Sequence, residues 1–400
     1  MAMIREYLGL KPTMAGFVAQ LLREFPRDEA MEWMFDDAEG MLQHRSGSQI
    51  NLQNMFLEYC ASKRSARGDL IRKYADLANV HSTEISPLWV AAAKNIYPVV
   101  RSQFVETTLE IKRRTDPLPY SPHVASPLAG DLQVRLVYDF GNYLSYVTEE
   151  HLTVWGQSKS DVHERALTNL AKLERPEWVD SGTGFSQLAS PMSFNESMLL
   201  LNRIVDRLPF KQHAVLIPSN RGILLAADGR SDSALQSMLS EAIRCHEQEP
   251  WPMTATLCTR VEGQWQEFRT FGDSARLAHN LFVIDRANFY ADQKDALDNF
   301  HAEAGRDVFT AGCSVRARDG INESMCVWTQ DVTSLLPSTD LIALAPSDEA
   351  IKFKLVRWHN VLDVCGYRMQ PTCESPPRFL VESFPDTSEW NSLVDERLYS

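Results

Sequence analysis

The sequence predicts an α+β protein: two related helix-strand-strand-helix units with antiparallel sheets, plus a smaller β-rich C-terminal domain. Two observations lead to this fold class. Residues 17–60 and 200–243 share one order of elements: an amphipathic helix, a proline, two short strand-like runs that meet at a glycine, and a second helix. From Val308 onward the chain changes to short strand-like runs separated by turns.

The similarity between the two units is clearest in their second helices. These read LQNMFLEYC from Leu52 and LQSMLSEAI from Leu235, so Leu, Gln, Met and Glu recur at one spacing, and Pro26 and Pro209 keep the same offset. An internal repeat constrains architecture more than any single element does, so we expect the two units to superpose. The apolar stripes of their helices predict a core with Leu21, Leu22, Met55, Phe56, Ile204, Val205, Met238 and Leu239.

The first domain is expected to cover residues 1–116, as the first unit with a helical extension. Thr13 stands where it can cap the first helix, and Pro26 ends that helix because proline cannot continue it. The later predicted elements are strands at 31–35 and 41–44 around an acidic turn, a helix from Leu52, and further helix across 87–112.

The second domain is expected to cover residues 117–305 and to contain the second unit. It opens with Pro117, Pro119, Pro122 and Pro127, which predict a linker. Asn195 is expected to cap the first helix of the second unit. The predicted elements are strands at 132–138 and 143–147, a helix at 160–173, an irregular stretch at 174–195, strands at 214–217 and 223–226, a hairpin at 254–268 and a helix at 291–304.

The third domain is expected to cover residues 306–400 and to be rich in strand. Asp319-Gly320 is a typical two-residue hairpin turn, because both residues tolerate a positive φ. Further strands are predicted at 341–344 and 351–358, and the segment from Trp358 to Cys365 is expected to lie in strand-like, apolar surroundings.

Charge and hydropathy exclude several classes of partner. The formal net charge is −13, and the first 120 residues are balanced, so the whole acidic excess lies after them. Nucleic-acid binding depends on a basic footprint, so we expect no nucleic-acid partner. No apolar stretch approaches 18 residues, which predicts no membrane span. The first residues lack a basic region followed by a long apolar core, so the sequence predicts a cytoplasmic protein.

Several spaced elements resemble the YtpQ-like family of uncharacterised bacterial proteins, which contain a domain of unknown function. The elements are the strand Asp131–Asp139, the step Tyr146–Leu152 from strand to helix, the helix end Ala166–Leu173, the strand pair Ala214–Gly229 and the step Glu249–Pro252. The resemblance covers roughly residues 10–270. Residues 218–222 depart from the family's usual Pro-Asn-Arg-Asp, and the tail after about residue 300 lies outside the resemblance. The resemblance implies a cytosolic bacterial α+β protein and implies no activity.

The sequence contains no convincing signature for a metal or a nucleotide. His151 and His163 are not spaced as a helical ligand pair, and Cys245-His246 with Cys258 lacks the second close pair that a zinc site needs. No phosphate-loop or dinucleotide fingerprint occurs, so we expect no cofactor and no metal. Cys365 has His359 and Asp363 nearby, but a buried inert cysteine is the favoured interpretation.

Four polar residues inside the family-like segments are the candidates for a catalytic site: Asp139, Glu149, His163 and Arg221. Residues of this kind at strand ends and turns are often presented to ligands. Arg221 can orient an anion or close an ion pair, and the ion pair is favoured. We expect a non-catalytic protein- or peptide-binding adaptor. The alternative is a hydrolase or transferase with a polar cleft between the two units.

Overall fold

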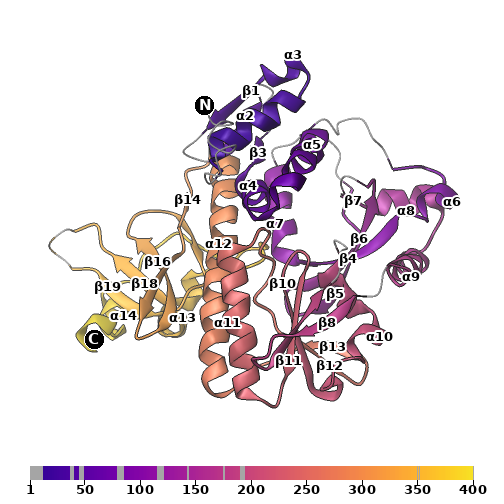
Figure 1. The fold of residues 1–400 in the computed structure, drawn as a ribbon. Helices are drawn as coiled ribbons and strands as arrows, with labels where there is room; N and C mark the ends of the chain where they lie inside the picture. The colour runs from indigo at the N-terminus through magenta and orange to yellow at the C-terminus, as the bar shows by residue number, and fades with distance from the viewer. Residues whose placement is uncertain are drawn as a thin grey trace.

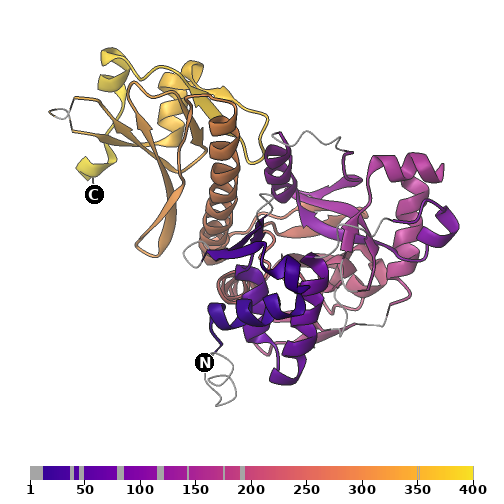
Figure 2. The ribbon, with the colours of Figure 1, turned by 90° about the horizontal axis from the view of Figure 1, so that it is seen from above.

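The computed structural model describes residues 12–36, 40–44, 49–78, 85–114, 121–141, 144–173, 176–189, 194–348, 350 and 352–399. Within them the chain is α+β, and its sheets are mostly antiparallel. Helices α11 (Asp232–Gln248) and α12 (Gly272–Glu303) run side by side through the middle of the molecule. The C-terminal strands lie on one side of α12, and the other sheets lie on the opposite side (Figures 1 and 2).

The N-terminal unit has a core of its own. Helix α2 (Met14–Glu24) is capped by Thr13, as predicted, because the Thr13 hydroxyl accepts a hydrogen bond from Gly16 N at 3.2 Å. Phe17, Leu21, Leu42 and Tyr59 are buried together in this core. The other elements are α3 (Arg27–Ala30), the sheet β1 (Trp33–Asp36), β2 (Met41–His44) and β3 (Gln49–Asn51), and the helices α4 (Gln53–Ala61), η1 (Arg64–Ala66) and α5 (Arg67–Ala78).

The next region corrects one prediction, because a strand divides the helix expected at 87–112. Between α6 (Trp89–Ala92) and α7 (Gln103–Arg113) lies β4 (Ile96–Ser102), which pairs along its whole length with β6 (Leu132–Asp139). Pro98 disfavours a helix interior, and β4 is almost wholly buried on both faces, so it lacks the alternating pattern of a half-exposed strand.

Strands β5 (Ala125–Ala129) and β7 (Leu144–Tyr146) share the other edge of β6. Pro127 therefore lies in a strand, whereas Pro117 and Pro119 of the predicted linker lie outside the described residues. Helices α8 (Glu149–Trp155) and α9 (Lys159–Leu170) cover one face of this sheet. The predicted strands at 132–138 and 143–147 and the helix at 160–173 are confirmed within two or three residues.

The next sheet is antiparallel and has six strands, in the order β13-β12-β10-β11-β9-β8. The predicted strands at 214–217 and 223–226 and the hairpin at 254–268 are confirmed in it. Its strands are β8 (Glu177–Asp180), β9 (Phe185–Ala189), β10 (Ala214–Asn220), β11 (Ile223–Asp228), β12 (Cys258–Val261) and β13 (Gln264–Glu267).

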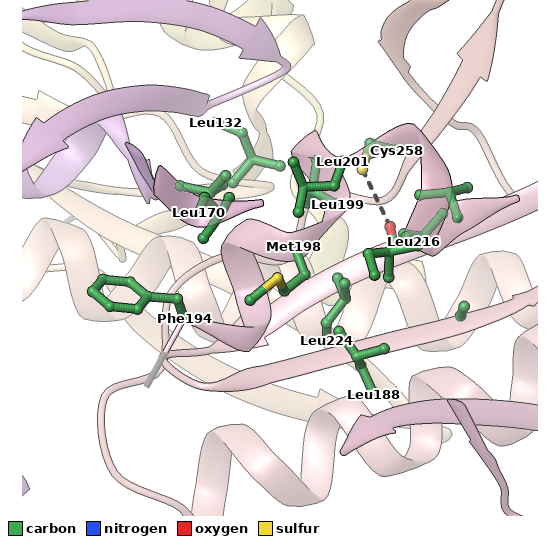
Figure 3. Packing of buried hydrophobic residues seen from close by; sticks show 14 of the residues in the cluster. Leu132, Leu170, Leu188, Phe194, Met198, Leu199, Leu201, Leu216, Leu224 and Cys258 are labelled. Atoms are coloured by element: carbon green, nitrogen blue, oxygen red, sulfur yellow. Dashed lines mark hydrogen bonds between the residues drawn. The ribbon is translucent and has the colours of Figure 1, made fainter. Parts of the chain in front are cut away.

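Both faces of this sheet are covered. Helix α11 packs on one face, and a larger cluster fills the space between the other face and the β4-β6 sheet (Figure 3). In that cluster Cys258 Sγ donates to Leu216 O at 3.5 Å. All seven residues of β10 are consequently buried.

Two expectations around this sheet were wrong. The stretch 174–195, expected to be irregular, contains β8 and β9, which pair in register from Glu177 with Ala189. Asn195 does not cap an α-helix: it begins the 3₁₀ helix η2 (Asn195–Leu200), which precedes the four-residue α10 (Asn202–Val205) and η3 (Lys211–His213). The Asn195 amide instead donates to Gly222 O at 3.1 Å.

Helix α12 is longer than the predicted 291–304 and starts at Gly272. Its earlier turns contact α11, α7 and the C-terminal sheet on different sides. A helix with several partners has apolar residues on several faces, so no single stripe predicts it.

The C-terminal region contains two four-stranded sheets, β14-β17-β21-β20 and β15-β16-β18-β19. Asp319 and Gly320 join β15 to β16 with φ values of 52° and 75°, which confirms the predicted hairpin turn. The segment Trp358–Cys365 is helix α13 rather than strand, because Trp358, Val361 and Cys365 share one buried face at helical spacing.

The C-terminal strands are β14 (Phe309–Thr310), β15 (Ser314–Arg318), β16 (Ile321–Thr329), β17 (Ser334–Pro337), β18 (Leu341–Ala345), β19 (Lys354–Arg357), β20 (Gln370–Pro371) and β21 (Arg378–Val381), and the further helices are η4 (Gly366–Arg368), α14 (Thr387–Ser392) and η5 (Glu396–Tyr399).

The predicted core is confirmed at five of its eight positions: Leu21, Ile204, Val205, Met238 and Leu239 are buried. Leu22, Met55 and Phe56 are only partly buried and pack at the border of the N-terminal core. No helix within the described residues is long and apolar enough to cross a membrane.

Candidate functional site

The structure places the four predicted site residues on four separate elements. Asp139 ends β6, Glu149 begins α8 and is exposed, His163 lies on α9, and Arg221 lies in the turn between β10 and β11. In the described part of the chain, no hydrogen bond or ion pair joins any two of them. The Asp139 carboxylate accepts from Gly141 N at 2.7 Å, and burial together with Lys159 lowers the pKa of His163.

Arg221 alone among the four lies in a polar cluster. Its guanidinium carbon is 4.5 Å from the centre of the Trp251 ring, and its backbone N donates to Trp251 O at 3.0 Å. Trp251 is itself anchored to the N-terminal unit: its backbone N donates to Asn54 Oδ1 at 3.0 Å, and its indole N–H donates to Glu58 at 3.3 Å. The predicted ion pair of Arg221 is absent from the described contacts, so this arginine is held by stacking.

The neighbour of Arg221 leads to a buried ion pair. Gly222 N donates to Glu196 Oε2 at 2.8 Å, and Glu196 Oε1 accepts from Arg101 at 2.7 Å. Arg101 and Glu196 are both buried, so their pairing offsets the cost of removing two charges from water. Tyr146 interacts electrostatically with Arg101 and with Arg221.

A separate cleft opens where three parts of the chain meet. Its volume is about 690 Å³, within the range of about 300–1,000 Å³ that is common for ligand sites. The walls come from the start of α7, the turn between β5 and β6, the segments that flank the β12–β13 hairpin, one side of α12, and the loop before β21. The apolar lining includes Phe104, Leu257, Phe268, Phe282 and Pro377, and the polar lining includes Gln103, Asp131, Thr256, Glu267, Arg269, Thr270, His279 and Arg286.

The charged lining of this cleft consists of two arginines, Arg269 and Arg286, and two carboxylates, Asp131 and Glu267. The Arg286 guanidinium lies 4.3 Å from the ring centre of Phe104 and 4.7 Å from that of Phe282. Among the described residues, neither Arg286 nor Arg269 has a carboxylate in ion-pair distance or an acceptor for its side-chain N–H groups. The rings fix the direction of Arg286, and its donors stay available to a ligand.

The acidic residue at the base of the cleft is already satisfied. Asp131 accepts from Ser102 Oγ at 2.5 Å, from Thr254 Oγ1 at 2.8 Å, and from Thr256 Oγ1. These bonds tie the end of β4 to the segment before β12. Asp131 therefore shapes the base of the cleft, and its oxygens are engaged by the protein.

Asp285 and His246 lie buried behind this base. Asp285 accepts from Ala255 N at 3.2 Å, and burial together with the nearby Asp131 raises its pKa to about 8. Burial lowers the pKa of His246 to about 4, so both groups are neutral at pH 7. Nε2 of His246 bonds Thr254 O at 3.2 Å, and Nδ1 is 4.0 Å from Asp285. The partner of His246 Nε2 is the backbone carbonyl of Thr254, and a carbonyl oxygen carries no proton that a general base could remove.

The remaining candidates are the Cys365 thiol and a metal site. Burial raises the pKa of Cys365 to about 12, so it is a thiol at neutral pH. A grouping of three or more His, Cys, Asp or Glu side chains that could hold a metal does not occur in the described part of the chain.

Sequence reasoning missed most of the residues that form both clusters. Arg101 and Glu196 are 95 residues apart, and Arg269 and Arg286 occur in unremarkable polar surroundings. The one available signal was Trp251 in Glu-Pro-Trp-Pro, because an aromatic residue between prolines marks a fixed turn.

No family model matches this chain, and no curated protein or solved structure shows significant similarity to it.

Proposed function

We propose that this protein is a non-catalytic protein- or peptide-binding module, and that its cleft holds a segment with an acidic side chain. The observation that carries the proposal is the pair Arg269 and Arg286, which line a cleft of about 690 Å³ without a carboxylate partner among the described residues. A buried or half-buried guanidinium favours a carboxylate that meets it in a bidentate way. A peptide carboxylate supplies that group.

The rest of the lining fits a peptide better than a small ion. Phe104, Phe268 and Phe282 offer apolar contact, whereas Gln103 and Thr270 offer side-chain hydrogen bonds. Mixed linings of this kind orient a ligand through a few polar groups and bind it through apolar surface. The hydrolase or transferase alternative needs Asp139, Glu149, His163 and Arg221 in one cleft, and no described contact supports that grouping.

Fluorescence anisotropy with labelled peptides tests the proposal. Three pools of random octapeptides are compared, with one central position fixed as Glu, Gln or Lys. We expect the Glu pool to bind most tightly to the full chain, and we expect Arg286→Gln to weaken that binding about tenfold or more, since one charge-assisted contact is lost. Arg276→Gln is the matched control, because Arg276 is exposed on the same helix and does not line the cleft.

Two outcomes would contradict the proposal. Equal binding of the Glu, Gln and Lys pools would remove the acidic preference. Equal loss in Arg286→Gln and Arg276→Gln would show that the charge of the helix, rather than the cleft, determines binding.

We also propose that the two helix-strand-strand-helix units arose by internal duplication in a cytosolic bacterial protein of the YtpQ-like family. The repeated Leu-Gln-x-Met-x-x-Glu run and the shared hairpin–helix order support a duplication. The ordered motifs within residues 10–270 support the family. An experimental structure in which β1, β2 and α4 fail to superpose on β10, β11 and α11 would end the duplication proposal, and cell fractionation of the native host tests the location.

A further inference from the structure

We propose that Arg221, Arg101 and Tyr146 form a second ligand site, separate from the cleft, which binds a phosphate group. The three residues come from the β10–β11 turn, from β4 and from β7, so the fold alone brings them together. Glu196 links two of these positions, because this one carboxylate accepts from Arg101 at 2.7 Å and from the backbone of Gly222, next to Arg221, at 2.8 Å. Tyr146 interacts electrostatically with both arginines.

Three cations lie around this point, Arg101, Arg221 and Lys73, and they face two carboxylates, Glu196 and Glu58. Both oxygens of Glu196 are engaged, and Glu58 already accepts from Tyr74 and from Trp251. Arg221, by contrast, has neither an ion pair nor a side-chain hydrogen bond in the described part of the chain. Its guanidinium is held in place by the Trp251 ring, 4.5 Å away, so little rotamer entropy is lost when it binds a ligand.

A second, independent observation concerns Arg101. This side chain is 8% exposed, and its Nε has no acceptor among the described residues. Buried donors almost always have a partner, so this unsatisfied donor leaves hydrogen-bonding capacity of the cluster unused. Arg221 is accessible to solvent, which gives a ligand a route to the site.

The two guanidinium groups also repel each other in the absence of an anion. The protein atoms around Arg221 and the nearby Arg101 together lower the pKa of Arg221 to about 10. A bound dianion would relieve that repulsion. Phosphate is favoured over a carboxylate because it carries about two charges and three acceptor oxygens, which suit two guanidinium groups and a tyrosine hydroxyl.

Isothermal titration of the full chain with inorganic phosphate tests this site, at constant ionic strength and with acetate as the comparison anion. We expect phosphate to bind at least about tenfold more tightly than acetate, and Arg221→Gln to weaken phosphate binding by about tenfold or more. Arg230→Gln is the control, because Arg230 is an exposed arginine just after β11 that pairs with Asp228 at 2.8 Å. This control should bind phosphate like the natural protein.

The indole N–H signal of Trp251 provides a second readout that does not depend on the Arg221 variant. It is identified through Trp251→Phe, and phosphate should shift it. The proposal is wrong if phosphate leaves this signal unchanged, if acetate binds as tightly, or if Arg286→Gln abolishes phosphate binding while Arg221→Gln does not. The last result would place the phosphate in the cleft, and peptide binding there would stand independently.

Discussion

The first unit, residues 14–61, and the second, residues 195–248, each place an antiparallel hairpin ahead of a helix, in two different environments. In the first unit the hairpin β1–β2 gains only β3, and the three strands form a separate sheet over their own small core. In the second unit β10 and β11 lie in the middle of the six-stranded sheet, with packed side chains on both faces.

The difference appears most clearly at equivalent helix positions. Met55 of α4 is partly buried, whereas Met238 of α11 is completely buried. The first helix differs as well: α2 is an ordinary eleven-residue helix, but the second unit has the short η2 and α10 in its place. The repeated pattern therefore specifies the same element type at the second helix but not at the first, and the tertiary surroundings decide the depth of burial.

The largest expected effect comes from truncating the two methionines. Met238→Ala should lower the free energy of unfolding by about 2–5 kcal/mol, because it leaves a cavity in a closed core. Met55→Ala should cost about 1 kcal/mol, since its side chain already meets solvent. Urea unfolding of the full chain measures both. Equal losses of unfolding free energy would show that the two methionines are equally buried, and would contradict the difference between the two units.

Sequence patterns predicted the elements whose environment is simple. Both hairpins, the β6–β7 pair and the Asp319-Gly320 turn follow from two-residue alternation and from residues that tolerate a positive φ. The failures share one cause. Strand β4 is buried on both faces and the first half of α12 packs against several neighbours, so their sequences lack a one-sided stripe. Helix α13 does have a buried face at helical spacing, but it is only eight residues long, and a short apolar run does not distinguish helix from strand.

The candidate site was less predictable for a related reason. Arg221 stood out because a charged residue at a strand turn is typical of a binding site, and it does lie in a polar cluster. Its neighbours Arg101, Glu196 and Tyr146 reach it only through the packing of distant strands. Spacing in the sequence carries no information about such contacts, and the same holds for Arg286 in the cleft.

The second largest expected effect is a dependence of the free energy of unfolding on pH. It arises from two buried groups, His246 near the end of α11 and Asp285 of α12, which lie 4.0 Å apart. The pKa of Asp285 is raised to about 8, so the native state holds a proton that the unfolded chain releases near pH 4. Stability therefore falls as the pH rises from about 4 to about 8. His246, with its pKa lowered to about 4, acts in the opposite direction between about pH 4 and 6.5.

Above about pH 6.5 His246 no longer contributes to this dependence, so the contribution of Asp285 is best followed from pH 6.5 to 8. We expect the free energy of unfolding to fall there by up to about 1.4 kcal/mol per pH unit, and we expect Asp285→Asn to remove most of that slope. Urea unfolding at three pH values measures it. An unchanged slope in the variant would assign the pH dependence to other groups.

The repeated glutamates give a smaller difference. Glu58 of the first unit accepts from Tyr74 and from the indole of Trp251, whereas Glu241 of the second pairs with the exposed Arg244 on its own helix at 2.7 Å. Glu58→Gln should cost about 1–2 kcal/mol because two bonds to a charged acceptor weaken. Glu241→Gln should cost about 0.5 kcal/mol or less, as exposed pairs do. Thermal unfolding compares the two, and a larger cost at Glu241 would reverse the assignment.

The smallest difference in unfolding free energy is expected between alanine substitutions at the two turn glycines, Gly40 and Gly222. These two positions are where the units are most alike. Gly40 and Gly222 both have a left-handed backbone, with φ values of 62° and 81°. An alanine there costs about 1 kcal/mol for conformation alone. At Gly222 an added Cβ meets no atom within 4 Å, so Gly222→Ala should show only this cost. If the turns are equivalent, Gly40→Ala should agree with it within about 0.5 kcal/mol in urea unfolding. A loss above about 2 kcal/mol at Gly40 would reveal crowding around the buried Gly40, and the two glycines would then not be equivalent.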